Sequence, residues 1–187
     1  MESNAPDVEP SPENVFRGEE VFSLISTLAD RIIESGEVDR DTVILSIANG
    51  GIDLGNLLRR LLEKQTGIAL GYGIVETSFH RDDIGSRPIP IVAHPTDIPV
   101  NIDGKTLIIV DDVIASGRTI RAAINEIFDL GRPAKILLAV LLDRGGRKLP
   151  FQPDFLADTI TVPQDRILKV HIDEEDPIGH QIQLLPR

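Results

Sequence analysis

The stretch from Thr106 to Thr119, TLIIVDDVIASGRT, constrains the fold more than any other part of the chain. Leu107 to Val110 is a continuous run of leucine and β-branched residues, which is typical of a strand buried on both faces. Asp111 and Asp112 follow where the strand should leave the sheet. A turn of small residues comes next, and then apolar residues at helical spacing, namely Ile120, Ala123, Ile124, Ile127 and Phe128. The stretch therefore predicts a strand, an acidic pair, a tight turn and a helix.

The turn has the residues of an anion site, which are Ala115, Ser116, Gly117, Arg118 and Thr119. A helix N-terminus preceded by glycine and hydroxyl residues offers unpaired backbone N–H groups and a positive dipole end to a phosphate. Asp111 and Asp112 would repel a phosphate that touched them. We therefore expect them one sugar-length away, where they accept hydrogen bonds from hydroxyls or hold a divalent metal ion. The implied ligand is a ribose phosphate.

Other segments repeat the alternation of strand and helix. Apolar spacing predicts helices over residues 18–34 and 52–64, and continuous or alternating apolar runs predict strands over 42–47, 69–77 and 135–142. Such strand-turn-helix units imply an α/β fold in which a parallel sheet is flanked by helices and ligands bind at the carboxyl ends of the strands. The alternation of Leu168 and Val170 with polar residues predicts an edge strand, and the acidic run 173–176 predicts a solvated end.

Composition limits the class of protein. The 187 residues suit one domain, which we place at 15–187 after a disordered tail over 1–14. The absence of Cys excludes disulfides and is compatible with a reducing compartment, and no apolar stretch suggests a membrane span, so we expect a cytoplasmic protein. A net charge of −11 disfavours RNA binding, although a local basic patch would still permit it.

The motif from Val110 to Thr119 resembles the phosphoribosyl pyrophosphate (PRPP) signature of the type I phosphoribosyltransferases. Five further segments resemble the PyrR family within that group, namely His80 to Asp83, Asp97 to Val100, Arg121 to Ala123, Asp129 to Pro133 and Ala139 to Gly145. The resemblance covers about residues 15 to 175. PyrR proteins are uracil phosphoribosyltransferases that in many bacteria also regulate pyrimidine operons by binding messenger RNA.

The resemblance implies a role for each part of the site. Asp111 and Asp112 would act on the ribose hydroxyls and Mg²⁺, and the turn 115–119 would bind the 5′-phosphate of PRPP. Asn49, Gly50 and Gly51 would hold pyrophosphate through backbone N–H groups, although a plain turn would also contain such glycines. Arg81, in a flexible lid loop, would reach the pyrophosphate on closure, unless the loop is a charged surface hairpin.

The base would lie under a small hood formed by Pro150 to Asp165. Four residues at the end of the strand over 135–142 would bind it, namely Leu141, Leu142, Asp143 and Arg144, although Asp143 and Arg144 would equally suit a surface ion pair. This chain departs from PyrR proteins in two places: Asn49 to Gly51 lack the usual arginines, and Ala157 to Thr159 replace a Gly-Lys-Asn segment. The first departure predicts weaker pyrophosphate binding, and the second leaves the identity of the base open.

The leading expectation is the reaction of uracil with PRPP that gives UMP and pyrophosphate. A second is a sensor of PRPP or UMP that has lost turnover, and a third is a phosphoribosyltransferase for another nucleobase. The nucleotide product would share the site. We also expect a homodimer or homotetramer.

Overall fold

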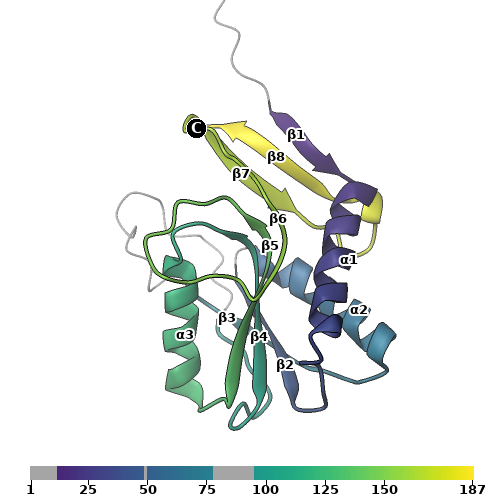
Figure 1. The fold of residues 1–187 in the computed structure, drawn as a ribbon, viewed down its shortest axis with the longest axis vertical. Coiled ribbons are helices and arrows are strands. Elements are labelled where there is room, and N and C mark those ends of the chain that lie inside the picture. The colour runs from purple at the N-terminus through teal and green to yellow at the C-terminus, as the bar shows by residue number, and fades with distance from the viewer. Residues whose placement is uncertain (1–11, 49, 78–94) are drawn as a thin grey trace, which may run out of the picture.

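The computed structural model describes residues 12–48, 50–77 and 95–187. Its centre is a parallel five-stranded sheet in the order β3-β2-β4-β5-β6, formed by β2 (Thr42–Ile47), β3 (Gly71–Val75), β4 (Thr106–Ile114), β5 (Lys135–Asp143) and β6 (Phe155–Thr159). Helices α1 (Glu19–Glu34) and α2 (Gly51–Thr66) cover one face, and α3 (Arg118–Leu130) covers the other (Figure 1). The predicted α/β fold is confirmed. No helix within the described ranges is long and apolar enough to cross a membrane.

The continuous apolar run of β4 serves both helix layers. Ile108 and Val110 belong to the apolar cluster that includes α1 and α2, whereas Leu107 and Ile109 belong to the cluster that includes α3. All four side chains are completely buried. Since successive side chains of a strand point to opposite faces, a strand between two helix layers has to be apolar at every position.

The end of β4 differs from the sequence prediction. We expected the strand to stop before Asp111, but it continues to Ile114 because β5 pairs with it that far. The other neighbour, β2, pairs with β4 only up to Val110. Beyond Val110 the start of α2 lies beside β4 in the place of β2. The two backbones are so close there that a Cβ added to Gly51 would lie 2.5 Å from the Val110 carbonyl oxygen. The acidic pair therefore lies within β4, beside the N-terminus of α2.

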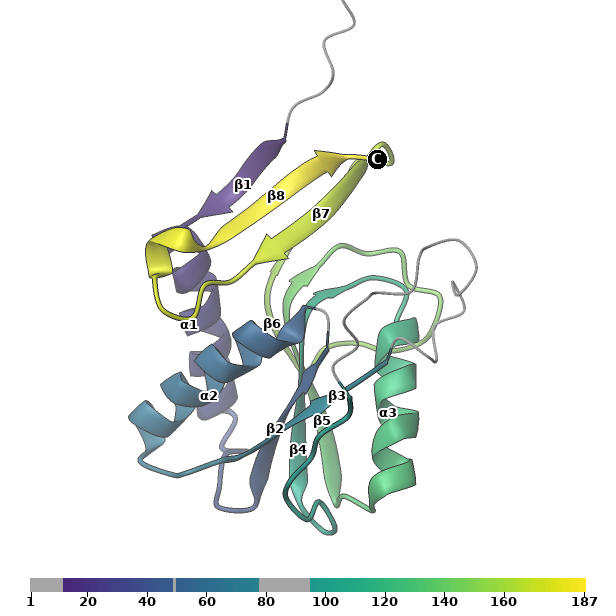
Figure 2. The same cartoon turned by 180° about the vertical axis from the view of Figure 1, so that it is seen from behind.

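A second, antiparallel sheet lies above the carboxyl ends of the main strands (Figure 2). Its order is β1-β8-β7, with β1 (Glu13–Arg17), β7 (Arg166–His171) and β8 (Gln181–Pro186). We call this three-stranded sheet the hood. Its edge strand β7 confirms the edge strand expected around Leu168 and Val170.

The predicted location of the hood was wrong. Pro150 to Asp165 instead contribute β6, which pairs with β5 in the main sheet and buries Phe155 and Ala157. The real hood joins segments far apart in sequence, since Glu13 pairs with Leu184. Residues 13 and 14, which we placed in the tail, are part of β1.

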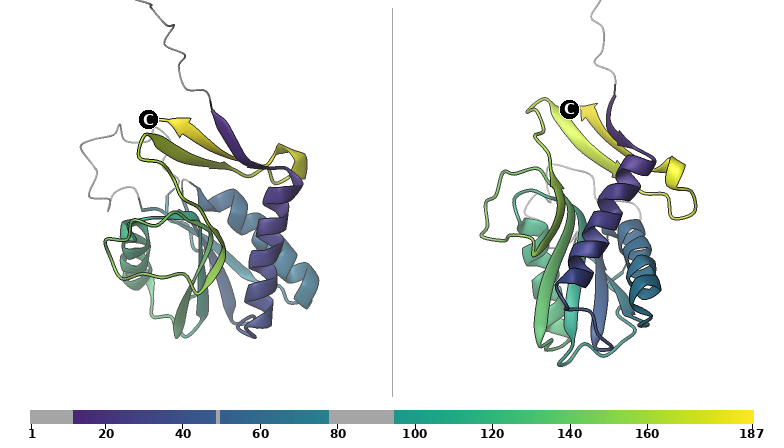
Figure 3. Two further views of the ribbon diagram at one scale, coloured as in Figure 1. Left: turned by 45° about the horizontal axis from the view of Figure 1, so that its top comes forward. Right: turned by 45° about the vertical axis from the view of Figure 1, so that its right-hand side comes forward.

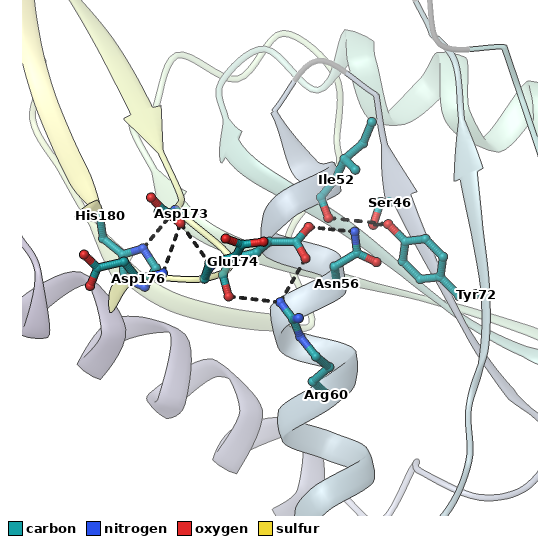
Figure 4. Close-up of polar contacts among 10 residues, drawn as sticks. Ser46, Ile52, Asn56, Arg60, Tyr72, Asp173, Glu174, Asp176 and His180 are labelled. Carbon is teal, nitrogen blue, oxygen red and sulfur yellow. Dashed lines mark hydrogen bonds and ion pairs between the residues drawn. The ribbon is translucent and has the colours of Figure 1, made fainter. Parts of the chain in front are cut away.

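The acidic run 173–176, between β7 and β8, holds the hood on α2. The Glu174 carboxylate accepts hydrogen bonds from Asn56 Nδ2 at 2.8 Å and from an Arg60 guanidinium nitrogen at 2.9 Å (Figure 4). The Asp173 carboxylate accepts the backbone N–H groups of Glu175 and Asp176 at 2.9 and 3.1 Å. Two members of a run that we expected to be a solvated end are therefore structural. In both views of Figure 3 the hood lies beside the N-terminal end of α1.

His180 is buried where the hood meets α1. Its Nδ1 accepts the backbone N–H of Asp173 at 3.0 Å, and its ring stacks on Phe22 with 6.4 Å between the ring centroids. Burial lowers the pKa of His180 below its ordinary value of 6.5, a shift that the charge of Asp173 opposes first, followed by that of Asp176, while the nearby His171 adds to it. Protonation would put a charge in this site and remove the acceptor of the Asp173 N–H group.

We expect this histidine to make the protein less stable in acid. Below pH 6.5 His180 is protonated in the unfolded chain but stays neutral in the folded protein. The free energy of unfolding therefore falls as the pH drops below that value. Urea unfolding at pH 7.5 and 5.5 measures the effect. His180→Gln should lose less stability than the parent on going from pH 7.5 to 5.5, whereas His171→Gln, which removes only the smaller contribution of a neighbouring charge, should keep most of the parent's loss. An equal change in all three proteins would contradict the prediction.

Candidate functional site

A cavity of about 240 Å³ lies between the end of β4, the start of α3 and the hood. Its polar and charged lining residues come from three parts of the chain and are Asp111, Asp112, Ser116, Thr119, Arg144 and Arg187. Gly117 lines the floor, and Ile167 and Leu168 of β7 supply apolar surface from the hood. The structure therefore brings the acidic pair, the turn 115–119 and the hood together around one space.

The acidic pair is held in a poorly solvated position. Asp111 is 6% exposed and Asp112 is half-buried. Burial raises the pKa of Asp112 to about 6, although hydrogen bonds with the Val113 backbone and the Asp111 side chain oppose the shift. At neutral pH the folded protein thus keeps a carboxylate that water solvates badly, which favours a ligand offering hydroxyl donors or a cation.

The turn 115–119 has the backbone that an anion site needs. Gly117 takes the left-handed conformation, with φ of +85°, and α3 begins at the next residue. Gly117 has no side chain with which to cap the helix, and the first N–H group of α3, that of Arg118, donates to the Ser116 hydroxyl oxygen at 3.3 Å. The N-terminus of a helix also offers further backbone N–H groups to an anion. The Ser116 hydroxyl and the Thr119 side chain stand at the same cavity.

The second predicted loop also reaches the acidic pair. A Cβ on Gly50 would lie 2.7 Å from a carboxylate oxygen of Asp112, so the backbone of Gly50 lies directly against that side chain. Gly51 packs on the backbone of Val110 and begins α2. Asn49 lies outside the described residues, as does the predicted lid with Arg81.

The four predicted base-binding residues do not all line the cavity. Leu141 and Leu142 are completely buried, because β5 lies between two strands and two helix layers. The Asp143 carboxylate accepts hydrogen bonds from Arg147 and from the backbone of Gly145. Only Arg144 of the four lines the cavity.

Sequence reasoning missed three cavity residues, namely Ile167, Leu168 and Arg187. The alternating pattern around Leu168 predicted a strand, but it carried no signal of what that strand would cover. A second cavity of about 340 Å³ lies beside the first and shares Ala115, Ser116 and Arg144 with it. Arg118 and Lys148 add two more cations there, so a local basic patch exists in this acidic chain.

Comparison with known proteins agrees with this geometry. Residues 11–171 match the family model of the phosphoribosyl transferase domain. The chain belongs to this family. Phosphoribosyltransferases similar to it in sequence include the bifunctional protein PyrR of Picosynechococcus sp., 38% identical over 87% of this chain and 91% of the relative. The PyrR protein of Roseiflexus sp. is 36% identical over 88% of this chain and 90% of the relative. The predicted likeness to the PyrR family is confirmed.

Solved phosphoribosyltransferases share the fold. The hypoxanthine phosphoribosyltransferase of Trypanosoma cruzi superposes with a TM-score of 0.67, at 21% identity, over 93% of this chain and 96% of that one. The HGPRT-ase of Leishmania tarentolae, solved in complex with GMP, gives a TM-score of 0.66 at 18% identity, over 92% and 95% of the two chains. At these identities the likeness concerns the fold alone.

Phosphoribosyltransferases generally use Mg²⁺ with PRPP, and the acidic pair suits that ion. Mg²⁺ commonly binds one or two carboxylates and takes its other ligands from substrate phosphates and water. Asp111 and Asp112 supply two carboxylates at the cavity, and the described residues contain no group of three metal-ligating side chains. The donor set therefore fits an ion that arrives with a phosphorylated ligand better than one caged by the protein alone.

Proposed function

We propose that this phosphoribosyltransferase converts uracil and PRPP into UMP and pyrophosphate. The observation that carries the proposal is the single cavity in which Asp111 and Asp112 lie beside the turn 115–119 and beneath the hood. An acidic pair, a phosphate-binding helix terminus and an apolar cover match the ribose, the 5′-phosphate and a planar base. Similarity to PyrR proteins supports uracil as that base.

In this proposal the turn 115–119 holds the 5′-phosphate, and Asp111 and Asp112 accept hydrogen bonds from the ribose hydroxyls. Mg²⁺ bound at the same carboxylates would neutralise charge on the departing pyrophosphate. The bond from C1′ to pyrophosphate breaks, the bond from C1′ to N1 of uracil forms, and the N1 proton is released. Ile167 and Leu168 would cover the base, and Arg144 would donate to one of its carbonyl groups. Orientation and charge neutralisation supply the rate, since the mechanism needs no covalent nucleophile.

Turnover with a panel of bases tests the proposal. The protein is incubated with PRPP, Mg²⁺ and either uracil, cytosine, hypoxanthine or guanine, and nucleotides are separated by chromatography. We expect UMP from uracil, and no nucleotide from the Asp111→Asn, Asp112→Asn double variant. Turnover with another base alone would replace uracil in the proposal.

A sensor that binds PRPP or UMP without turnover is the second candidate, and the absence of arginine from Asn49 to Gly51 favours it. Calorimetry that shows PRPP binding in a protein inactive with every base would establish this function. Asn49→Arg should then strengthen PRPP binding about tenfold, since hydrogen bonds to charged groups contribute roughly 1.5–3 kcal/mol. We also expect a homodimer or homotetramer, which analytical ultracentrifugation measures.

We expect RNA binding to be weak, because the chain has a net charge of −11 and a pI near 4.7. The similar proteins are named bifunctional, and that name does not support this expectation. Filter binding of pyrimidine-operon leader RNA at moderate salt measures the affinity, with a scrambled RNA as the control. Tight binding that distinguishes the two RNAs would show that the basic patch around Arg118, Arg144 and Lys148 outweighs the overall charge.

A further inference from the structure

Arg147 joins three segments behind the turn 115–119. Its guanidinium donates to the Ala115 carbonyl oxygen at 2.7 Å and to the Phe151 carbonyl oxygen at 2.8 Å. Two further hydrogen bonds, of 2.7 and 3.1 Å, go to the two carboxylate oxygens of Asp143. The side chains of Arg147 and Asp143 are only 17% and 18% exposed. Arg147 thus links the turn to the end of β5 and to the segment that follows it.

The neighbouring backbone makes the same connection. Lys148 and Leu149 both donate their N–H groups to the Ser116 carbonyl oxygen at 3.0 Å, and Arg144 donates to the Ile114 carbonyl oxygen at 3.1 Å. A Cβ on Gly117 would lie 3.2 Å from the ring of Phe151, so the segment 144–151 also packs closely against the turn. The rear of the turn is therefore fixed by residues 144–151, while its front lines the cavity.

We propose that Arg147 is a positioning residue for the phosphate-binding turn 115–119, an inference that rests on the proposed function. Arg147 does not line either cavity described above, so its effect on a ligand passes through the turn. A bidentate arginine fixes geometry as well as charge, because its planar fork holds donors in set directions. Holding Ala115 fixes the carbonyl side of the turn and with it the direction of the N–H groups that would meet the 5′-phosphate.

Asp143 takes a different role in this proposal from the one predicted. We predicted that Asp143 would bind the base, but its carboxylate accepts hydrogen bonds from Arg147 and from the Gly145 N–H group. In this assignment Asp143 orients Arg147, and Arg144, its neighbour in sequence, is the residue at the end of β5 that faces the cavity. The sequence suggested a surface ion pair between Asp143 and Arg144, but Asp143 pairs with Arg147 instead, and we assign that pair to the support of the turn.

Arg147→Lys separates position from charge, because lysine keeps a cation beside Asp143 but lacks the planar fork. We expect hydrogen exchange of the peptide segment 113–120 to become at least about tenfold faster, as expected when hydrogen bonds from a charged group are lost. The Kd for PRPP should rise by a similar factor, and KM for PRPP should rise more than kcat falls. The melting temperature should fall less in Arg147→Lys than in Arg147→Ala, in which Asp143 is left without its partner.

Arg132→Lys is the matched control, since Arg132 also donates to two main-chain carbonyl groups, those of Phe128 and Gly131, but lies at the opposite end of α3. It should leave PRPP affinity and exchange of 113–120 at parental values. Parental exchange in Arg147→Lys would overturn the proposal, and so would faster exchange with parental PRPP affinity. If the parent binds no PRPP, the proposed function fails, while the exchange measurement, made without ligand, still decides whether Arg147 holds the turn.

Discussion

Asp112→Asn is expected to abolish PRPP binding and, at the same time, to stabilise the protein. The folded pKa of about 6 lies above the ordinary value of 3.8, so the folded state holds its proton more tightly than the unfolded chain does. The free energy of unfolding therefore falls as the pH rises from about 3.8 to 6. At neutral pH the charged carboxylate lowers it by on the order of 3 kcal/mol. Asparagine removes that cost, but it also removes the acceptor that would serve ribose hydroxyls and Mg²⁺.

Calorimetry with PRPP and thermal unfolding at pH 7.5 without metal test both parts. The melting temperature should rise by about 5 °C or more, given the usual relation between stability and melting temperature in a domain of this size. Asp129→Asn, at an exposed position near the end of α3, should change neither quantity. A folded Asp112→Asn protein with parental PRPP affinity would remove the acidic pair from the site.

Gly50→Val is expected to weaken PRPP binding by about tenfold to a hundredfold. The new Cβ would lie 2.7 Å from an Asp112 carboxylate oxygen, a distance that forces the carboxylate or the loop to move. Moving the carboxylate loses hydrogen bonds to a charged group, each of which contributes roughly 1.5–3 kcal/mol. The loop would also lose the close backbone approach that glycine permits.

Gly104→Val is the control for this prediction. Gly50 and Gly104 both have a positive φ, of +159° and +72°. A Cβ on Gly104 would meet no atom within 4 Å, and this residue precedes the start of β4 and does not line the cavity. The control should lose stability through backbone strain while PRPP affinity, measured by calorimetry, stays at the parental value. If Gly50→Val also keeps parental affinity and turnover, the loop is only a structural turn.

The sequence predicted those elements whose periodicity is local. β2 and α1 were predicted nearly to the residue, because a strand covered on both faces is apolar throughout and an amphipathic helix repeats its apolar side chains every three to four residues. The grouping of Asp111 and Asp112 with the turn 115–119 was also predictable, since these residues are neighbours in sequence. Their roles in binding remain predictions.

Arrangements that depend on distant contacts could not be predicted in this way. The pairing of Glu13 with Leu184 leaves no periodic signal, so the hood was assigned to Pro150–Asp165, whose aromatic and proline residues suggested irregular structure. Likewise, nothing in the order Asp143-Arg144 shows which of the two side chains faces the cavity. Asp143 was assigned to the base from the resemblance, and its pairing with Arg147, four residues later, could not be predicted because it depends on the fold of the intervening turn.

The positions of the three hood strands in the sequence affect the order in which the site can form during synthesis. Its middle strand, β8, comes from residues 181–186, and both β1 and β7 pair with it. During synthesis the acidic pair and the turn 115–119 leave the ribosome before β8 does, so they emerge while the cavity still lacks its cover. Long-range pairings of this kind form slowly. A chain that lacks residues 181–186 would therefore keep the residues that form the floor of the site but lose the middle strand of the hood.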